Sequence, residues 1–392
     1  MDTFDLHLRK GREKAVATRH PWIFSGALQK SDIRLTDGSL VRIFDYFDKF
    51  LAIGHYQSSS IAVRILSFED VAIDTDFFKK KLTQALEARI AGGLIISPEN
   101  NCYRWVNGEG DGLPGLIVDL YGELVVVQFH SHGMFAQRMD ILAAINAVCK
   151  THPSIYFSFP DASRREELAE EIGFQQGAVE TCHIKENGMQ FLIDPDKGQK
   201  TGFFLDQRDN REYLSKIANG KKVLNAFSYS GGFSVAALKG GAEKVHSVDI
   251  SPYACELCEQ HIKINGFDPA VNQVFTADVM DFLKTSEEQY DIVILDPPAF
   301  AKSRKKSHNA VQAYKRLNIL GLKNVVSGGL LLTFSCSQVV SKQLFEDTIR
   351  AAGIESGRSI RILKSLSAGI DHPVNLFHTE GHYLKGLVLQ VI

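Results

Sequence analysis

The chain has 392 residues, of which 44% are hydrophobic and 23% are charged, and its formal net charge is −2 at pH 7. This composition predicts a soluble globular protein with two or three domains. A net charge so close to zero gives no overall signature of polyanion binding, so any contact with nucleic acid must come from local basic patches.

Cysteine usage and the lack of long apolar runs indicate the compartment. The six cysteines are scattered without the paired spacing of a disulfide framework, which suits a reducing environment. The close pair Cys255 and Cys258 falls in a predicted helix with no second pair, so we expect no metal site. We recognise no signal peptide and no run long enough to span a bilayer. A cytoplasmic protein without membrane contact is therefore expected, and a homodimer is left open.

Residues 1–70 are predicted to form a small β-rich domain. Alternating runs separated by turn signals predict three strands, at 39–44, 50–54 and 61–66. The preceding segment 8–14 is basic, and the next one contains aromatic residues. A compact barrel with a basic, aromatic rim is typical of an RNA-binding accessory domain. For Trp22 and Phe24 themselves we prefer the simpler interpretation that both are core residues.

Residues 74–180 are predicted to form a central α+β domain. Its predicted helices lie at 76–91, 135–149 and 163–172, and its predicted strands at 102–106, 116–119 and 124–129. The glycine-rich segment 107–115 joins two strands and precedes no helix. We interpret it as a turn and not as a phosphate-binding loop.

Residues 185–392 alternate strand and helix, which predicts a mostly parallel sheet with helices on both faces. Within them, 221–249 has the pattern of strand, glycine turn, helix and strand. Such a turn holds a cofactor because glycine lets the backbone approach closely and the following helix begins with free N–H groups. The turn suits a small uncharged or zwitterionic group, and it consists of Ser228, Tyr229, Ser230, Gly231 and Gly232. The alternative is an ordinary turn that binds nothing.

Three carboxylates end successive predicted strands of this domain. Asp249 lies 249 − 231 = 18 residues after Gly231, close to the offset of about 20 residues expected for a ribose-binding carboxylate. Asp278 and Asp296 end the next two strands. Because strands of a parallel sheet end at one edge, these residues together predict a nucleoside-type cofactor site.

The segment after Asp296 adds a binding surface for a flat base. In Pro297-Pro298-Ala299-Phe300, the rigid proline pair would hold a wall against which Phe300 could stack a base. The alternative is a structural turn with an aspartate cap. Between Pro297 and Phe345 there is no Asp or Glu, and four of the basic residues in this stretch directly follow Phe300: Lys302, Arg304, Lys305 and Lys306. They predict phosphate contacts, although a charge run is often only a solvated surface.

Over essentially its whole length, the chain resembles the PUA-linked class I S-adenosylmethionine-dependent methyltransferases that make 5-methylcytidine in 23S ribosomal RNA. The motifs that carry the resemblance are 20–26, 111–115, 200–208, 296–300 and 335–337. The string 200–208, KTGFFLDQR, is the most specific of them. The resemblance implies a Rossmann-like class I methyltransferase domain, an N-terminal PUA-like β-barrel, S-adenosylmethionine as cofactor and ribosomal RNA as partner.

The resemblance also implies a role for each motif residue. Phe204, Gln207 and Arg208 would border the cofactor, 228–232 would hold its methionine end, Asp249 would bind the ribose, Asp278 would lie near the adenine amino group, Asp296 would line the reaction centre, and Cys336 would attack the target base. One feature departs from the pattern. Many RNA cytosine-5 methyltransferases have a second cysteine directly after the proline pair, where this chain has Ala299. The chain therefore resembles the branch with one active-site cysteine, and the base that removes the proton is unassigned.

The proposed chemistry gives Cys336 a role beyond packing. Carbon 5 of cytosine becomes nucleophilic only after a thiolate has added to carbon 6. A lone cysteine at a strand end is more often an inert core residue. Two alternatives stay open: an N-methyltransferase acting on guanine or adenine, which would need no thiol, and a non-catalytic RNA-binding assembly factor that keeps the fold.

Overall fold

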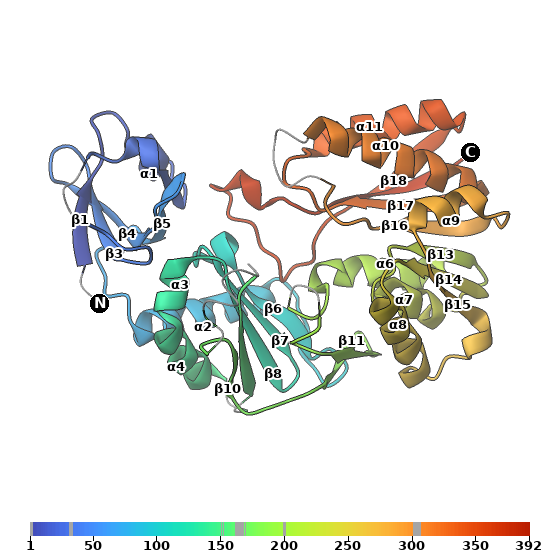
Figure 1. Ribbon diagram of the computed structural model, residues 1–392, viewed down its shortest axis with the longest axis horizontal. Coiled ribbons are helices and arrows are strands. Elements are labelled where there is room, and N and C mark those ends of the chain that lie inside the picture. The colour runs from blue at the N-terminus through green and yellow to red at the C-terminus, as the bar shows by residue number, and fades with distance from the viewer. Residues whose placement is uncertain are drawn as a thin grey trace. The chain divides into compact units, whose positions relative to one another are not determined.

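The computed structural model describes residues 3–30, 34–149, 151, 153–160, 168, 170–198, 201–300 and 307–392, except the side chain of Ser307. The chain forms two compact units (Figure 1). The first unit comprises the chain up to residue 184 with 193–205 and 370–381, and the second comprises 185–192, 206–369 and 382–392. The chain therefore passes from one unit to the other several times. The motif 200–208 is divided between the units.

The first unit begins with a five-stranded sheet. Its strands are β1 (Thr3–His7), β2 (Trp22–Phe24), β3 (Leu40–Phe44), β4 (Phe50–Tyr56) and β5 (Ile61–Ser67), with the short helix α1 (Lys14–Ala17). The order is β1-β3-β4-β5-β2, and β1 pairs parallel with β3. Strands β3 to β5 confirm the three predicted runs, whereas β1 and β2 were not predicted. The added strands complete the sheet on its two edges.

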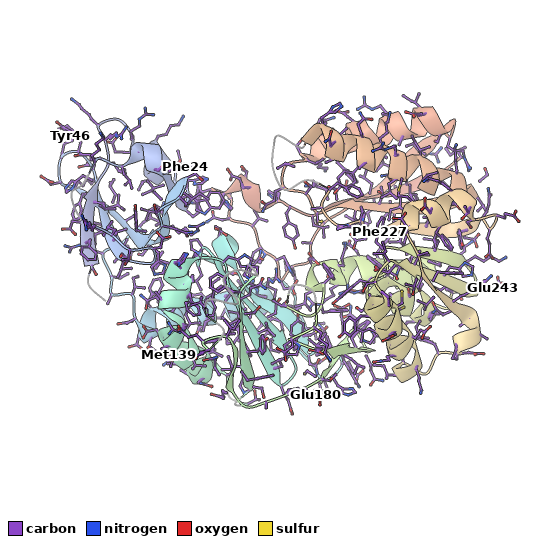
Figure 2. The ribbon with its side chains drawn as sticks, viewed as in Figure 1. Phe24, Tyr46, Met139, Glu180, Phe227 and Glu243 are labelled. Atoms are coloured by element: carbon purple, nitrogen blue, oxygen red, sulfur yellow. The ribbon has the colours of Figure 1, made fainter. Side chains whose placement is uncertain are left out.

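The side-chain orientation of the edge strand β2 differs from our expectation. Ile23 is 1% exposed, whereas its neighbour Phe24 is 48% exposed (Figure 2), and Trp22 is half-buried. Successive side chains of a strand point to opposite faces, so a buried Ile23 places Phe24 on the outer face. The prediction that Phe24 is a core residue is therefore wrong.

A second five-stranded sheet completes the first unit. Its strands are β6 (Cys102–Asn107), β7 (Leu116–Tyr121), β8 (Leu124–Phe129), β9 (Ser154–Ser158) and β10 (Gly173–Gln176), and its helices are α2 (Thr75–Ala91), α3 (His132–Ala136) and α4 (Arg138–Val148). The helix predicted at 135–149 is two helices, because Gln137 leaves helical geometry between them. The helix predicted at 163–172 lies largely outside the described residues. The glycine-rich segment contains the short 3-10 helix η2 (Gly108–Asp111), and no α-helix follows it before β7.

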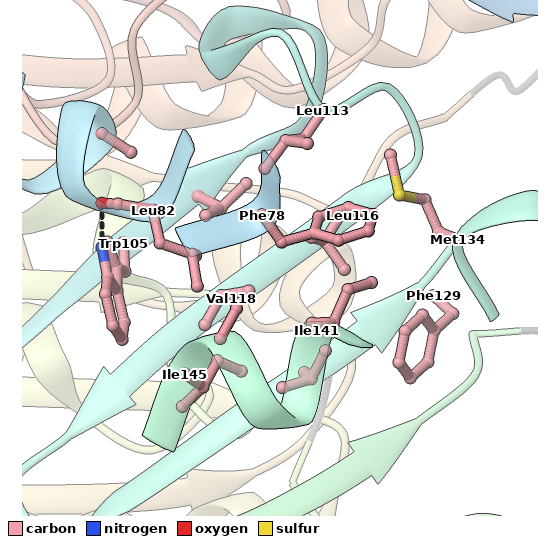
Figure 3. Close-up of a cluster of buried hydrophobic side chains, with 14 of the residues drawn as sticks. Phe78, Leu82, Trp105, Leu113, Leu116, Val118, Phe129, Met134, Ile141 and Ile145 are labelled. Atoms are coloured by element: carbon pink, nitrogen blue, oxygen red, sulfur yellow. Dashed lines mark hydrogen bonds between the residues drawn. The ribbon is translucent and has the colours of Figure 1, made fainter. Parts of the chain in front are cut away.

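The core of this sheet lies beneath α2 and α4 (Figure 3). Phe78 and Leu82 of α2 pack with Trp105 of β6, whose indole N–H donates to the Leu82 carbonyl at 2.9 Å. Ile141 and Ile145 of α4 close the same cluster and are fully buried. The bond matters because a buried indole N–H without an acceptor would be costly.

Buried hydrogen bonds hold the segment 370–381 against the rest of the first unit. Arg89, 1% exposed, forks onto the Asp111 carboxylate and also donates to the carbonyl of Asp371 at 2.9 Å. The Asp371 carboxylate accepts from the backbone N–H of Arg104 at 3.0 Å. A buried arginine is tolerated when its donors are satisfied in this way.

The second unit is built on a seven-stranded sheet of order β15-β14-β13-β16-β17-β19-β18. The strands are β13 (Lys222–Ala226), β14 (Lys244–Asp249), β15 (Asn272–Thr276), β16 (Tyr290–Leu295), β17 (Val325–Ser335), β18 (Ile360–Leu366) and β19 (Lys385–Val391), and a separate hairpin is formed by β11 (Cys182–Glu186) and β12 (Met189–Ile193). Strands β13 to β17 run parallel, and β19 runs antiparallel between β17 and β18. The predicted mostly parallel sheet is confirmed.

Helices cover both faces of this sheet (Figure 1). They are α6 (Arg208–Ile217), α7 (Gly232–Lys239) and α8 (Pro252–Ile264) on one face, and α9 (Val279–Thr285), α10 (Ser307–Asn324) and α11 (Lys342–Ser356) on the other. Because β13 to β17 are parallel, the loops that follow them meet at one edge of the sheet. The antiparallel strand β19 begins at that same edge. Within the described residues, no helix combines the length and the apolar character needed to cross a membrane.

The buried face of α2 makes a test of the first unit's core. Replacing Phe78 with Ala removes a fully buried ring from the cluster of Figure 3, and we expect a loss of about 3–5 kcal/mol in the free energy of unfolding. The matched control is Ile90→Ala on the same helix, where the side chain is 56% exposed and the change should stay within about 0.5 kcal/mol. Thermal unfolding of both variants checks this, and equal destabilisation would contradict the packing.

Candidate active site

The loop after β13 has an unusual backbone. Phe227, Tyr229 and Gly231 take φ angles of 59°, 44° and 77°, in the left-handed region that residues other than glycine rarely adopt (Figure 2 labels Phe227). A β-carbon on Gly231 would also lie 2.4 Å from the Cys258 sulfur. Glycine is thus required at this position both by backbone angle and by space. Strained backbone of this kind is concentrated at ligand sites, because the surrounding structure must enforce it.

Asp249, the predicted ribose ligand, enforces part of that loop. Its carboxylate accepts from the backbone N–H of Tyr229 and of Ser251, each at 2.9 Å. The N–H of Ser228 in turn donates to the Val248 carbonyl at 2.9 Å. Two of the carboxylate's roughly four acceptor positions are occupied by these bonds, so capacity for a ligand hydroxyl is left. The structure gives Asp249 a structural role, and its contact with ribose stays a prediction.

His261 of α8 supports the same loop, and sequence reasoning missed it. Its Nε2 accepts from the backbone N–H of Leu192 at 2.9 Å, so the proton is on Nδ1, which donates to the Ser230 carbonyl at 2.7 Å. Burial lowers the pKa of His261 to about 4, so the ring is neutral at physiological pH. A single histidine in a helical stretch gives no sequence signal for this role, since both partners are backbone groups far away in the chain.

The polar groups of the glycine turn fit a small polar ligand. The Ser228 hydroxyl is buried and has no hydrogen-bond partner among the described residues. Buried polar atoms nearly always have partners, so an orphaned hydroxyl in a strained loop indicates a ligand group. Below the loop, Asn225 donates to the Ser234 hydroxyl at 2.8 Å, which lies 2.7 Å from that of Ser247. These contacts tie α7 to β13 and β14, and the contact of the turn with the methionine end of S-adenosylmethionine stays a prediction.

Asp278 has a structural role in the described chain. It is exposed and caps α9, because its carboxylate accepts from the backbone N–H of Asp281 at 3.1 Å. Its contact with adenine stays a prediction. An exposed carboxylate beside a helix start is compatible with either role.

Asp296 and Gln207, predicted separately, lie in one hydrogen-bond chain. The Gln207 amide donates to the Asp296 carboxylate at 2.9 Å and accepts from the Asn210 amide at 2.6 Å. Asn210 donates as well to the Ser367 carbonyl at 3.1 Å. Gln207 and Asn210 are each 2% exposed. Asn210, which sequence reasoning missed, therefore fixes which way the Gln207 amide points and so the position of the Asp296 carboxylate.

Arg208 lies against a buried carboxylate. Its Nε is 3.8 Å from Glu186, which is fully buried and accepts two bonds of 2.6 Å from Arg211. Phe204 belongs to the first unit, so its predicted contact with the cofactor stays a prediction. Lys200 of the same motif lies outside the described residues.

The segment after β16 and the end of β17 come together. The Cys336 thiol, half-buried, points at the Pro297 carbonyl with a sulfur–oxygen distance of 3.8 Å. Pro298 is exposed, and half-buried Phe300 packs edge-on against Tyr314 with ring centroids 4.7 Å apart. The site thus joins a thiol, a carboxylate and an aromatic ring at one sheet edge.

The basic run predicted to contact phosphates, Lys302, Arg304, Lys305 and Lys306, lies outside the described residues. Among the residues that the structure does describe, no group of three or more His, Cys, Asp or Glu side chains could hold a metal ion.

The requirement for Gly231 can be tested against a matched glycine. Gly266 has a similar φ of 74°, but a β-carbon there would meet nothing within 4 Å. We expect Gly266→Ala to cost about 1–2 kcal/mol in folding stability, with unchanged affinity for S-adenosylmethionine. Gly231→Ala must also displace Cys258, so we expect cofactor affinity to fall at least tenfold. Calorimetric titration of both variants measures these affinities. Equal affinities would show that the loop does not contribute to cofactor binding.

Comparison with known proteins identifies the family of the second half of the chain and of its N-terminal domain. Residues 158–365 match a family described as S-adenosylmethionine-dependent methyltransferase, and residues 6–68 match one described as PUA-like domain. The chain is 40% identical over 395 residues to ribosomal RNA large subunit methyltransferase I of Aeromonas salmonicida (strain A449), with 98% of each chain covered. It is 37% identical over 400 residues to the protein of that name from Escherichia coli (strain SMS-3-5 / SECEC), with 99% of each covered.

Solved structures agree over the full length. A SAM-dependent methyltransferase from Streptococcus mutans superimposes with a TM-score of 0.84 at 26% identity, covering 99% of this chain and 100% of its own. A methyltransferase complexed with SAH gives 0.85 at 26% identity, with both chains covered completely. The family match spans more than half of the chain, and the relatives span nearly all of it. The chain therefore belongs to the S-adenosylmethionine-dependent methyltransferases, with a PUA-like domain at its N-terminus, and S-adenosylmethionine is its cofactor.

Proposed function

We propose that this protein transfers a methyl group from S-adenosylmethionine to carbon 5 of a cytidine in large-subunit (23S) ribosomal RNA, with Cys336 as the nucleophile. The observation that carries the proposal is the position of the thiol, whose sulfur lies 3.8 Å from the carbonyl oxygen of Pro297, the residue that follows Asp296. A thiol at the reaction centre is needed for carbon-5 chemistry and superfluous for methylation of an exocyclic amine. The relatives named ribosomal RNA large subunit methyltransferase I support the class of RNA.

The chemistry assigns a step to each group at the sheet edge. The cofactor supplies an electrophilic methyl group when bound. The Cys336 thiolate gives its electron pair to carbon 6 of cytosine, and the displaced ring electrons allow carbon 5 to accept the methyl group. A base then removes the proton on carbon 5, the double bond re-forms, and the sulfur leaves with its electron pair. Asp296, held by Gln207, would line the reaction centre and orient the target cytosine.

The flipped base needs a surface to lie against. A cytosine inside a stacked RNA cannot reach a sheet edge, so it must be extruded and held in a pocket. Phe300, half-buried against Tyr314, would offer an aromatic surface for it, with the proline pair as the adjoining wall. The rigidity of that wall comes from the fixed φ angles of Pro297 and Pro298.

The N-terminal sheet would provide a separate contact with RNA. Tyr46 and Phe47 are 51% and 73% exposed, and the Lys10 ammonium lies 5.9 Å from the centre of the Tyr46 ring (Figure 2 labels Tyr46). Arg9 and Arg12 are exposed nearby in sequence. Aromatic rings beside basic groups combine base stacking with phosphate attraction. We assign RNA binding to residues 1–70, keep 74–180 and 185–392 as central and catalytic domains, and place the reaction in the cytoplasm.

The nucleophile can be tested by trapping it. RNA containing 5-fluorocytosine has no proton to lose at carbon 5, so the reaction should stop as a protein–RNA adduct that survives denaturing electrophoresis. We expect Cys336→Ala to abolish both adduct and methylation while S-adenosylmethionine still binds. The matched control is Cys149→Ala, which removes another half-buried thiol in the first unit and should leave the adduct unchanged.

The opposite pattern identifies the alternative activity. A Cys336→Ala enzyme that still methylates RNA, with no adduct from the unmodified protein, would point to N-methylation of guanine or adenine. A protein that binds RNA but transfers no methyl group would instead be an assembly factor.

The proposed RNA surface allows a second test. Tyr46→Ala with Phe47→Ala removes two exposed rings, and stacking loss should weaken RNA binding by about 1–3 kcal/mol per base contact. Folding stability should hardly change because both rings are exposed. Ile95→Ala, which removes a side chain that is 73% exposed elsewhere on the first unit, is the control. Fluorescence-anisotropy titration with ribosomal RNA fragments measures the effect. Identical affinities for the three proteins would remove this surface from the RNA interface.

A further inference from the structure

A buried lysine begins β19. Lys385 is 9% exposed, and its ammonium donates to the Ser337 carbonyl at 2.6 Å. Among the described residues, no carboxylate oxygen lies within 4.0 Å of it, unlike the buried guanidinium of Arg211 with its partner Glu186. Burying an ammonium without a counter-charge is costly, so an unpaired buried lysine needs an explanation.

Strand pairing places this lysine beside the proposed nucleophile. In the antiparallel pair of β17 and β19, Lys385 lies opposite Ser335, and its side chain reaches the carbonyl of Ser337. Cys336 is the residue between those two. The lysine side chain therefore passes close to the backbone of Cys336.

The pKa of Lys385 also depends on Cys336. Burial lowers the pKa of Lys385 to about 8, and Cys336 acts in the opposite direction and raises it. No carboxylate contributes. Interaction between two titrating groups is mutual, so a cation that is favoured by the sulfur also favours the negative sulfur. At neutral pH a lysine with a pKa of about 8 still carries its proton.

Two other titratable groups that the structure describes near this end of β17, Tyr314 and Asp296, supply no positive charge. Tyr314 of α10 is influenced by both Cys336 and Asp296, and burial raises the pKa of Tyr314 to about 12, so it is neutral at working pH. Asp296, at the end of β16, is an acid and cannot supply a positive charge. Lys385 is a positive group at this edge of the sheet, and Cys336 raises its pKa.

We propose that the Lys385 ammonium is the counter-charge that holds the Cys336 sulfur as a thiolate, which makes Lys385 a positioning residue for the nucleophile. Its meaning for catalysis rests on the function proposed above, although the charge pairing itself does not. The sulfur is negative in the free enzyme, neutral while bonded to carbon 6, and negative again when it leaves. An ammonium fixed beside it favours both the attacking and the departing anion.

The test compares two replacements of the lysine in the full-length protein. Lys385→Arg keeps the charge and a donor for the Ser337 carbonyl, whereas Lys385→Gln keeps a donor and removes the charge. Alkylation by iodoacetamide is followed across pH by mass spectrometry of the peptide that contains Cys336. Cys149 is an internal reference, since burial raises its pKa to about 11. We expect half-maximal alkylation of Cys336 at similar pH in the unmodified protein and Lys385→Arg, and about one pH unit or more higher in Lys385→Gln.

A reciprocal measurement keeps the proposal testable if Lys385→Gln folds poorly. Removing the sulfur with Cys336→Ala should lower the pH at which Lys385 reacts with acetic anhydride, because the group that raises its pKa is gone. Equal profiles for Lys385 with and without the sulfur would overturn the pairing. So would a Lys385→Gln protein that binds S-adenosylmethionine normally and alkylates like the unmodified one, since a merely structural lysine would leave the pH profile in place.

Failure of the proposed function gives a different pattern. A shifted alkylation profile without a 5-fluorocytosine adduct would retain the pairing and remove the cytosine chemistry. A 5-fluorocytosine adduct without a shift in the alkylation profile would retain the cytosine chemistry and remove the pairing of Lys385 with Cys336.

Discussion

The parallel register of β13 to β17 decides where the chemistry of this protein can occur. Because these strands point the same way, the glycine turn, the three carboxylates and the Cys336 thiol are delivered to one edge of the sheet, although they are spread over more than a hundred residues of sequence. The antiparallel strand β19 adds a group that the parallel strands could not. It runs towards the opposite edge, so its first residue, and not its last, arrives at the site. Reversing that one strand would leave Lys385 at the far end of the sheet.

Residues at this edge serve the loop and the ligand at once. Asp249 holds the strained turn through the Tyr229 N–H and the start of α8 through the Ser251 N–H, and His261 holds the turn through the Ser230 carbonyl. A loop with non-glycine residues at positive φ would relax without such bonds, since each costs of order 1–3 kcal/mol. Binding and shape are therefore coupled. Loss of affinity after replacing Asp249 would combine a missing ligand contact with a relaxed turn, which is why the Gly231 and Gly266 pair separates the two effects more cleanly.

The sequence predicted what depends on local pattern. Strand ends, the glycine turn and the proline pair are consecutive residues, so the succession of β13 to β17 along the chain and the sheet edge of the candidate site could be inferred. What was missed depends on contacts between distant segments. Asn210 becomes important only because Gln207 meets Asp296, 89 residues away, and His261 only because its partners are backbone groups. Phe24 was assigned to the core because hydrophobic character does not reveal which face of an edge strand it occupies. The split of the motif 200–208 between two units likewise leaves no mark in the sequence.

Two buried cations of the second unit, Arg211 and Lys385, differ in how their charge is compensated. Arg211 donates two hydrogen bonds to the Glu186 carboxylate, so its positive charge is largely neutralised and has little effect on neighbouring groups. Lys385 has a carbonyl as acceptor and no carboxylate among the described residues, so its charge remains effective at short range. A permanent carboxylate beside it would neutralise that field and would add a second negative charge next to the sulfur. A thiolate is a partner of another kind, because its charge disappears when it bonds to carbon and returns when it leaves. The missing carboxylate is therefore what a site needs if the cation must respond to the state of the nucleophile.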